Sequence, residues 1–139
     1  MSPGHILSII FAFIIVFSVM AFLWSKAKRG KRKISPQLYI DALKALLSGE
    51  EKVAFRKFKE VARGDPENVD AYLKLGDLFR KNKRYGKALQ IHKELTLRPS
   101  LSLEEKNEVL KSLAEDFSAS GNHDKAISVL EELYSFRKG

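Results

Sequence analysis

The histidines that could do acid–base or metal chemistry are few in this sequence and lie far apart. The three histidines, His5, His92 and His123, do not have the spacing of an HExxH motif or of another metal-binding motif. The chain contains no cysteine, which excludes disulfides, thiolate metal sites and cysteine nucleophiles and is compatible with a reducing compartment. It also contains no glycine-rich phosphate loop and no nucleophile elbow. We therefore expect a protein that is not an enzyme, with no catalytic residue, cofactor or metal.

Glu115 and Asp116 are adjacent carboxylates. Neighbouring residues of a helix point in different directions, so the pair does not form a catalytic constellation. The sequence predicts solvated surface charge at both positions.

A long uncharged stretch occupies residues 6–24. Its nineteen residues include only two polar ones, Ser8 and Ser18. As a helix rising about 1.5 Å per residue it would cover roughly 28 Å, close to the hydrocarbon thickness of a bilayer. A buried globular helix would show a polar face, and a cleaved signal peptide would carry basic residues before its apolar core and small residues after it. We therefore predict a retained transmembrane anchor in residues 1–25.

A basic linker, residues 26–34, follows the apolar stretch. Six lysines and arginines without an acidic residue lie in residues 26–33 and account for most of the net charge of +8. Basic residues beside a span are held on the cytoplasmic side, which predicts an N-terminus outside and a cytoplasmic remainder. The same residues can touch anionic headgroups, whereas a nucleic-acid patch is the alternative. The interface and topology residues are Trp24, Lys26, Lys28, Arg29, Lys31, Arg32 and Lys33.

The rest of the chain has helix-forming residues at helical spacing. Turn signals at residues 48–49, 64–66, 98–100 and 120–122 help to divide it into six predicted helices, near 36–48, 50–63, 68–82, 84–97, 103–119 and 123–136. Ser102 and Glu105 have the spacing of a capping box at the start of the fifth helix, and Gly121 is placed to end it.

An internal repeat relates the six helices. The second helices read EEKVAFRKFKEV, RYGKALQIHKEL and HDKAISVLEEL; Ala54 and Ala88 are 34 residues apart, and Ala88 and Ala126 are 38 apart. A helix–turn–helix unit of 34 residues with small and large residues at these positions is the tetratricopeptide repeat. The sequence predicts an all-α protein in which a transmembrane helix precedes a tetratricopeptide-repeat solenoid of three helix pairs. The repeat domain is residues 35–139, with repeats near 35–67, 68–101 and 102–136.

Matches to the repeat pattern predict where the helices meet. Gly76 and the three alanines should mark close approaches of paired helices. His92 falls at a packing position and is predicted to be partly buried and hydrogen-bonded, whereas His123 is predicted at the surface. The larger matching residues are Phe58, Pro66, Tyr72, Leu75, Phe79, Leu110, Leu113, Phe117 and Leu130, with the small Ala114.

Three stretches make the sequence resemble the lipopolysaccharide assembly protein B family. They are LGDLFR at 75–80, ALQIH at 88–92 and the lengthened loop RPSLS at 98–102, following the anchor and the basic linker. The resemblance implies a bacterial inner-membrane protein with cytoplasmic repeats. It would act as an adaptor that brings the deacetylase of the lipid A pathway to a membrane-bound AAA+ metalloprotease. Family members usually carry more repeats and a C-terminal rubredoxin-like module with two CxxC pairs, which this sequence lacks.

Helical spacing also predicts a partner-binding groove on the first helices of the repeats. A repeat solenoid presents a concave surface built from these helices, and a mixture of apolar and charged side chains suits a peptide or helix of another protein. A merely exposed face is the alternative, and a carboxylate clamp is not favoured because the groove has no asparagine. The groove residues are Tyr39, Leu43, Leu46, Asp70, Leu73, Asp77, Arg80, Glu108, Lys111 and Glu115.

A basic cluster in the second repeat could face lipid headgroups or nucleic acid. We expect a solvated face instead, because no aromatic platform is interleaved with the charges. The cluster comprises Lys74, Arg80, Lys81, Lys83, Arg84, Lys87, Lys93 and Arg98.

Three functions follow from these features. The first is a membrane-anchored adaptor that regulates lipopolysaccharide synthesis through protein partners. The second is a generic repeat scaffold of another inner-membrane assembly. The third is a basic, membrane-associated RNA-binding module, for which nucleic acid would have to bind despite the unfavourable pattern.

Overall fold

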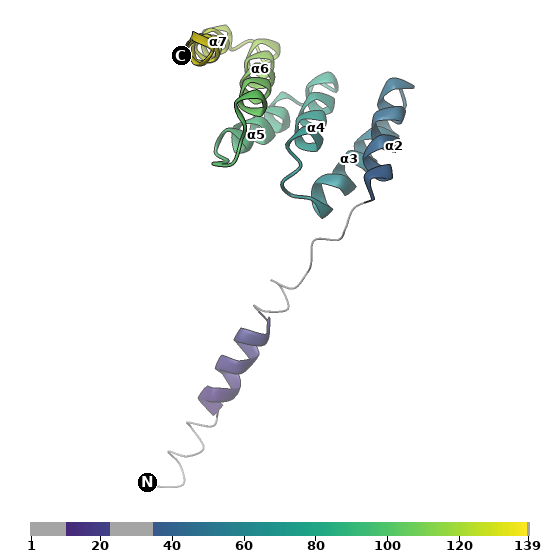
Figure 1. Cartoon of the computed structure of the whole chain (residues 1–139), viewed down its shortest axis with the longest axis vertical. Coiled ribbons are helices and arrows are strands. Elements are labelled where there is room, and N and C mark those ends of the chain that lie inside the picture. The colour runs from purple at the N-terminus through teal and green to yellow at the C-terminus, as the bar shows by residue number, and fades with distance from the viewer. Residues whose placement is uncertain (1–10, 23–34, 139) are drawn as a thin grey trace. The chain divides into compact units, whose positions relative to one another are not determined.

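The structure, a computed structural model, describes residues 11–22 and 35–138, with side chains to residue 135. The chain divides by its internal contacts into two units, Met1–Arg32 and Lys33–Gly139. In the first unit, residues 11–22 form a helix (Figure 1). The side chains of these residues are exposed. No helix within the described ranges is both long enough and apolar enough to cross a bilayer. The predicted span of residues 6–24 is only partly covered by the described residues 11–22, and Trp24 and the basic residues 26–33 lie outside the described residues.

Six helices make up the described part of the second unit. They are α2 (Pro36–Leu47), α3 (Glu51–Gly64), α4 (Val69–Lys81), α5 (Tyr85–Thr96), α6 (Leu103–Ala119) and α7 (His123–Lys138). No strand occurs among the residues that the structure describes. Each helix begins and ends within two residues of its predicted range, so turn chemistry and helical periodicity were sufficient to divide this part of the chain.

Local chemistry explains where the helices begin and end. The predicted capping box of α6 is present: the backbone N–H of Glu105 donates to Ser102 Oγ at 3.2 Å, and the backbone N–H of Ser102 donates to Glu105 Oε2 at 2.8 Å. The hydrogen bond from the backbone N–H of Ser102, followed by one from its side chain, lowers the pKa of Glu105 below its usual value. Gly121 has a φ of +82°, the left-handed conformation that ends α6 at low cost because glycine has no Cβ.

The helices pack in chain order as three pairs, α2 with α3, α4 with α5, and α6 with α7 (Figure 1). Each pair also contacts the next through α3 and α4 or through α5 and α6, and α4 packs directly on α6. Short turns join the two helices of each pair. The arrangement is consistent with a tetratricopeptide-like helical repeat.

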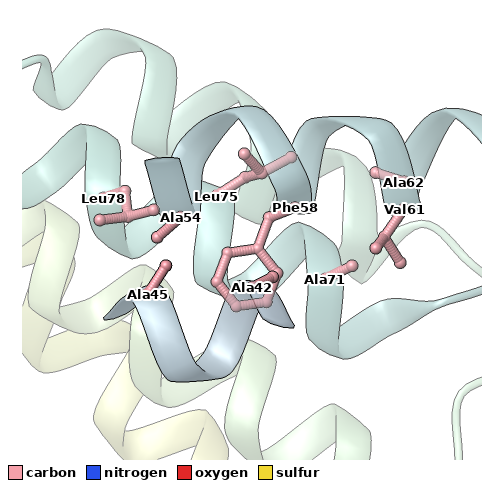
Figure 2. Close-up of a cluster of buried hydrophobic side chains, with 9 residues drawn as sticks. All are labelled: Ala42, Ala45, Ala54, Phe58, Val61, Ala62, Ala71, Leu75 and Leu78. Atoms are coloured by element: carbon pink, nitrogen blue, oxygen red, sulfur yellow. The ribbon is translucent and has the colours of Figure 1, made fainter. Parts of the chain in front are cut away.

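A buried apolar cluster joins the first pair to the second. Phe58 of α3 is fully buried in it, between small residues of α2 and α4 (Figure 2). Removing a side chain of this size from a core costs about 3–5 kcal/mol. The three repeat alanines are also buried, as the pattern predicts. The cluster consists of Ala42, Ala45, Ala54, Phe58, Val61, Ala62, Ala71, Leu75 and Leu78.

Candidate partner-binding surface

The ten predicted groove residues all lie on α2, α4 and α6, the first helices of the three pairs. Side-chain hydrogen bonds connect these helices. The hydroxyl of Tyr39 on α2 donates to Asp70 on α4, and Arg80 on α4 donates to Glu115 on α6 at 2.7 Å. We call the faces so connected the first-helix surface, which consists of the predicted groove residues other than Leu73.

Tyr39 is held from two sides rather than presented to solvent. Its ring meets Phe58 edge to face, with centroids 6.0 Å apart, while Asp70 accepts its hydroxyl hydrogen bond and also lies 3.6 Å from Lys74. Burial, the hydrogen bond to Asp70 and the charge of that carboxylate raise the pKa of Tyr39 to about 12. Tyr39 therefore contributes to docking α2 on α4.

Arg80 is the centre of the polar contacts between α4 and α6. Its Nη2 lies 2.7 Å from both Asp77 Oδ1 and Glu115 Oε2, and its Nη1 lies 2.7 Å from Asp116 Oδ1. The same Nη1 also donates to the backbone carbonyl oxygen of Ser112 at 3.3 Å. Burial alone would lower the pKa of Arg80, but the hydrogen bond to Asp116 and the three nearby carboxylates raise it above its usual value.

The burial of Asp116 differs from what the sequence predicts. Glu115 is exposed, as expected, but Asp116 is fully buried, and the prediction of a solvated charge there is wrong. Its Oδ2 accepts a hydrogen bond from His92 Nδ1 at 2.6 Å, while its Oδ1 accepts from Arg80. A buried carboxylate is tolerated only with partners of this kind. Helical phase could have indicated its burial, because Asp116 follows the core residues Val109 and Leu113 at spacings of seven and three.

His92 is a buried, hydrogen-bonded packing residue, as predicted, and its burial is complete. Its Nε2 lies 3.4 Å from the carbonyl oxygen of Leu73. A Cβ added at Gly76 would lie 2.2 Å from that same nitrogen. The close approach predicted at Gly76 is thus made by the His92 ring against the backbone of α4. Arg80, His92 and Asp116 together link α4, α5 and α6.

The other groove residues fall into different environments. Leu43 and Leu46 are half-buried against the core cluster. Leu73 is buried with Val69, Leu95 and Val109, so its placement in the groove is corrected: the side chain faces the interior. Glu108 and Lys111 are exposed and line a hollow of about 460 Å³ between α6 and α7, together with Glu104, Asn107 and Leu133.

The first-helix surface carries many charged side chains. Arg80 is surrounded by three carboxylates, and two further glutamates beside Lys111 line the hollow. Acidic charge therefore dominates around α6, which suits a basic or polar segment of a partner. No cluster of His, Cys, Asp and Glu able to hold a metal ion occurs among the described residues.

Comparison with known proteins identifies relatives of this chain. No model of a known protein family matches it. It is 30% identical over 95 residues to lipopolysaccharide assembly protein B of Escherichia coli (strain K12), an alignment covering 68% of this chain and 24% of the relative. It is 31% identical over 137 residues to the protein of the same name from Haemophilus influenzae, covering 88% of this chain and 34% of the relative.

The chain spans roughly a quarter to a third of the length of these curated relatives. The similarity nevertheless covers most of the chain itself and agrees with the resemblance drawn from LGDLFR, ALQIH and the lengthened loop. The chain therefore belongs to the lipopolysaccharide assembly protein B family.

Proposed function

We propose that the chain is a non-enzymatic adaptor that regulates lipopolysaccharide assembly by binding another protein on its first-helix surface. The observation that carries the proposal is the coincidence of this surface with sequence similarity to two proteins named for lipopolysaccharide assembly. Helical repeats of this kind act by presenting an extended surface to a partner. A protein partner therefore accounts for the fold and for the family together.

The charges on the exposed part of the first-helix surface indicate which kind of partner segment it would bind. Glu108 and Lys111 of this surface line the hollow beside α7, together with the neighbouring Glu104. Asp77 and Glu115 both pair with Arg80. The net acidic charge would steer a basic segment towards this surface and disfavour an acidic one. Nucleic acid is disfavoured on this surface for the same reason.

The proposed anchor is the uncharged stretch of residues 6–24, with the basic residues 26–33 on the cytoplasmic side of a bacterial inner membrane. Its support is the length and composition of the stretch and the charges that follow it. Anchoring would raise the local concentration of any partner in the same membrane, so weak contacts on the repeats would suffice. The finer proposal is that the partners are the lipid A pathway deacetylase and a membrane AAA+ metalloprotease, which the adaptor brings together.

The test uses a lipopolysaccharide-making bacterium that lacks its own adaptor. Expression of the full chain is expected to lower the level of the lipid A deacetylase, measured by immunoblot. Glu108→Lys should abolish this effect because it reverses an exposed charge in the hollow beside α7. Glu60→Lys, the same change at an exposed residue of α3, is the matched control and should act like the unaltered chain. Arg80 and Tyr39 are unsuitable targets because both hold the helices together.

Deletion of residues 1–25 should also abolish the effect while leaving the repeats folded, as judged by circular dichroism. An unchanged deacetylase level with the full chain would refute the deacetylase proposal. A generic scaffold of another inner-membrane assembly would then be favoured, and capture of a different membrane protein, lost in Glu108→Lys, would support it.

A further inference from the structure

A second surface hollow lies at the junction of α3 and α4. Its volume is about 910 Å³, roughly twice that of the hollow between α6 and α7. The lining comes from the turn before α3, from α3 itself, from the end of α4 and from the turn that follows. None of its lining residues belongs to the first-helix surface. We call it the α3–α4 groove.

The floor of the α3–α4 groove is apolar and aromatic. The rings of Phe55 and Phe79 meet edge to face, with centroids 5.1 Å apart and planes at 79°. Val53 and Leu78 complete the apolar lining. Both phenylalanines are half-buried, so they form the bottom of a depression. An apolar side chain that entered it would contact two aromatic rings.

The rim of the groove is basic. Lys52, Arg56 and Arg84 line it, and none of the three forms a salt bridge with another described residue. The Arg84 guanidinium lies 5.3 Å from the centre of the Phe79 ring, and Lys87 Nζ lies 5.6 Å from it. Cations over a ring face in this way remain open to a carboxylate on their other side.

Two acidic residues also line the groove, but they do not cancel this charge. Glu51 lies 2.6 Å from Lys81 Nζ and accepts a weaker hydrogen bond from Asn82 at 3.4 Å. The hydrogen bond from Lys81, followed by its charge, lowers the pKa of Glu51 below its usual value. Because Glu51 is paired with Lys81, Glu50 is the only acidic lining residue left to offset the basic side chains of the rim. The rim is therefore positive and the floor apolar.

We propose that the α3–α4 groove binds an acidic segment of a second protein, which packs one aromatic or aliphatic side chain against the rings of Phe55 and Phe79. The carboxylates of the segment would pair with Lys52, Arg56 and Arg84, because opposite charge around a desolvated apolar anchor is the common composition of a recognition site. The proposal goes beyond the proposed function, since it adds a second partner site of opposite charge preference to the first-helix surface.

The shape of the groove favours a peptide over a lipid surface or RNA. Insertion into a bilayer requires apolar side chains that protrude, whereas Phe55 and Phe79 are recessed. Base stacking requires an accessible ring face, whereas two cations lie over Phe79. A peptide side chain can enter a depression of this kind from above.

The experiment measures binding of a fluorescent synthetic peptide, made of aspartates and glutamates around one central phenylalanine, to the full chain in zwitterionic micelles. Fluorescence anisotropy gives the affinity. The double variant Arg56→Glu with Arg84→Glu should weaken binding about tenfold or more, because it reverses two rim charges. Lys59→Glu changes an exposed residue of α3 outside the groove and should leave affinity within about twofold. The peptide with alanine in place of phenylalanine should bind more weakly to the unaltered chain.

Equal affinities for the double variant and Lys59→Glu would overturn the proposal, because binding would then be non-specific charge attraction. Equal affinities of the phenylalanine and alanine peptides would overturn the apolar anchor and with it the proposal. The same variants are measured against vesicles containing phosphatidylglycerol. Loss of vesicle binding in the double variant, with peptide affinity unchanged, would assign the groove to lipid instead. Circular dichroism checks that each variant is folded. Phe79→Leu is a second variant without a charge change, and it should weaken binding of the phenylalanine peptide more than binding of the alanine peptide.

Discussion

The adjacent carboxylates of α6 show how strongly environment decides what a residue does. Glu115 has a side chain that is 47% exposed and shares Arg80 with two other acids. Asp116 is completely buried, and both of its oxygens are taken, one by Arg80 and one by His92. Surface ion pairs contribute little to stability, whereas a buried charge that loses its partner is costly. The two residues should therefore differ greatly when they are replaced.

We predict that Asp116→Ala lowers the free energy of unfolding by about 3–5 kcal/mol, because it leaves Arg80 and His92 without their shared partner. Glu115→Ala, its neighbour and control, should change stability by about 0–1 kcal/mol. Urea unfolding followed by circular dichroism measures both. Similar losses for the two variants would contradict the contact network described for Asp116.

Tyr39 provides a prediction for alkaline pH. Its pKa of about 12 in the folded chain exceeds the value of about 10 expected in an unfolded chain. The folded state therefore retains the hydroxyl proton of Tyr39 more tightly than the unfolded state does. The resulting contribution of Tyr39 to folding stability is present below pH 10 and is lost as the pH rises from about 10 to about 12. The stability of Tyr39→Phe should fall less steeply over this interval than that of the unaltered chain. Parallel stability curves for the two proteins would show that Tyr39 is not the group responsible.

Residue-level prediction from sequence succeeded where the repeat pattern determines packing and failed where a charge is buried. The burial of Ala54, Ala88 and His92 follows from their repeat positions. The sequence predicts surface charge at Asp116 because it and Glu115, as helix neighbours, point in different directions and form no catalytic pair. The partners that allow its burial lie 24 and 36 residues away in the chain. The rim and floor of the α3–α4 groove likewise come from two helix pairs, which spacing along one helix does not reveal.

At the scale of the helix, α4 depends on a glycine at an interior position. Glycine normally lowers helix stability by about 1 kcal/mol relative to alanine. At Gly76 the missing Cβ makes room for the His92 ring. The hydrogen bond between His92 and Asp116 restricts the movement of that ring. Gly86 of α5 has open space where its Cβ would be. The two glycines have opposite consequences for their helices.

We predict that Gly76→Ala destabilises the protein by about 1–3 kcal/mol, because the added methyl group overlaps the His92 ring. Gly86→Ala should instead be neutral or stabilise by up to about 1 kcal/mol, because it restricts the unfolded chain without a clash. Differential scanning calorimetry of the two variants checks the difference. Stabilisation by both substitutions would mean that His92 does not occupy the space beside Gly76.

Helix boundaries were the most predictable feature at this scale. Ser102, Glu105 and Gly121 specify the two ends of α6 by local hydrogen bonding and backbone conformation, which do not depend on the rest of the fold. Face assignment was less predictable. Leu73 lies on a first helix at groove spacing, yet it packs inward on Leu95 and Val109, because α4 is contacted by α3, α5 and α6 and so has more than one buried face.

At the scale of the whole molecule, the charges are distributed unevenly along the chain. The basic residues 26–33 follow an uncharged stretch, the rim of the α3–α4 groove is basic, and acidic residues dominate around α6. These segments suit an anionic membrane surface, an acidic segment and a basic segment respectively. One chain could therefore meet three different surfaces by charge alone.

We predict that a reporter enzyme fused to the C-terminus of the full chain is active in the cytoplasm, because the basic run lies after the apolar stretch. Replacing the six basic residues of 26–33 with glutamine should produce mixed orientations. Paired reporters that are active only in the cytoplasm or only in the periplasm measure this. Periplasmic activity of the unaltered fusion would contradict the proposed topology.

The bridge made by Arg80, Asp116 and His92 also bears on how the repeats come apart. In a helical array whose units touch only their neighbours, each unit can open almost independently, starting from the ends. Here α6 cannot leave α4 or α5 without separating its own Asp116 from Arg80 and His92, which would leave those two side chains without their shared partner. The three helices should therefore open together, and their slowest amide hydrogens should exchange with solvent in a single concerted event. The last two repeats would then behave, in energetic terms, as one unit.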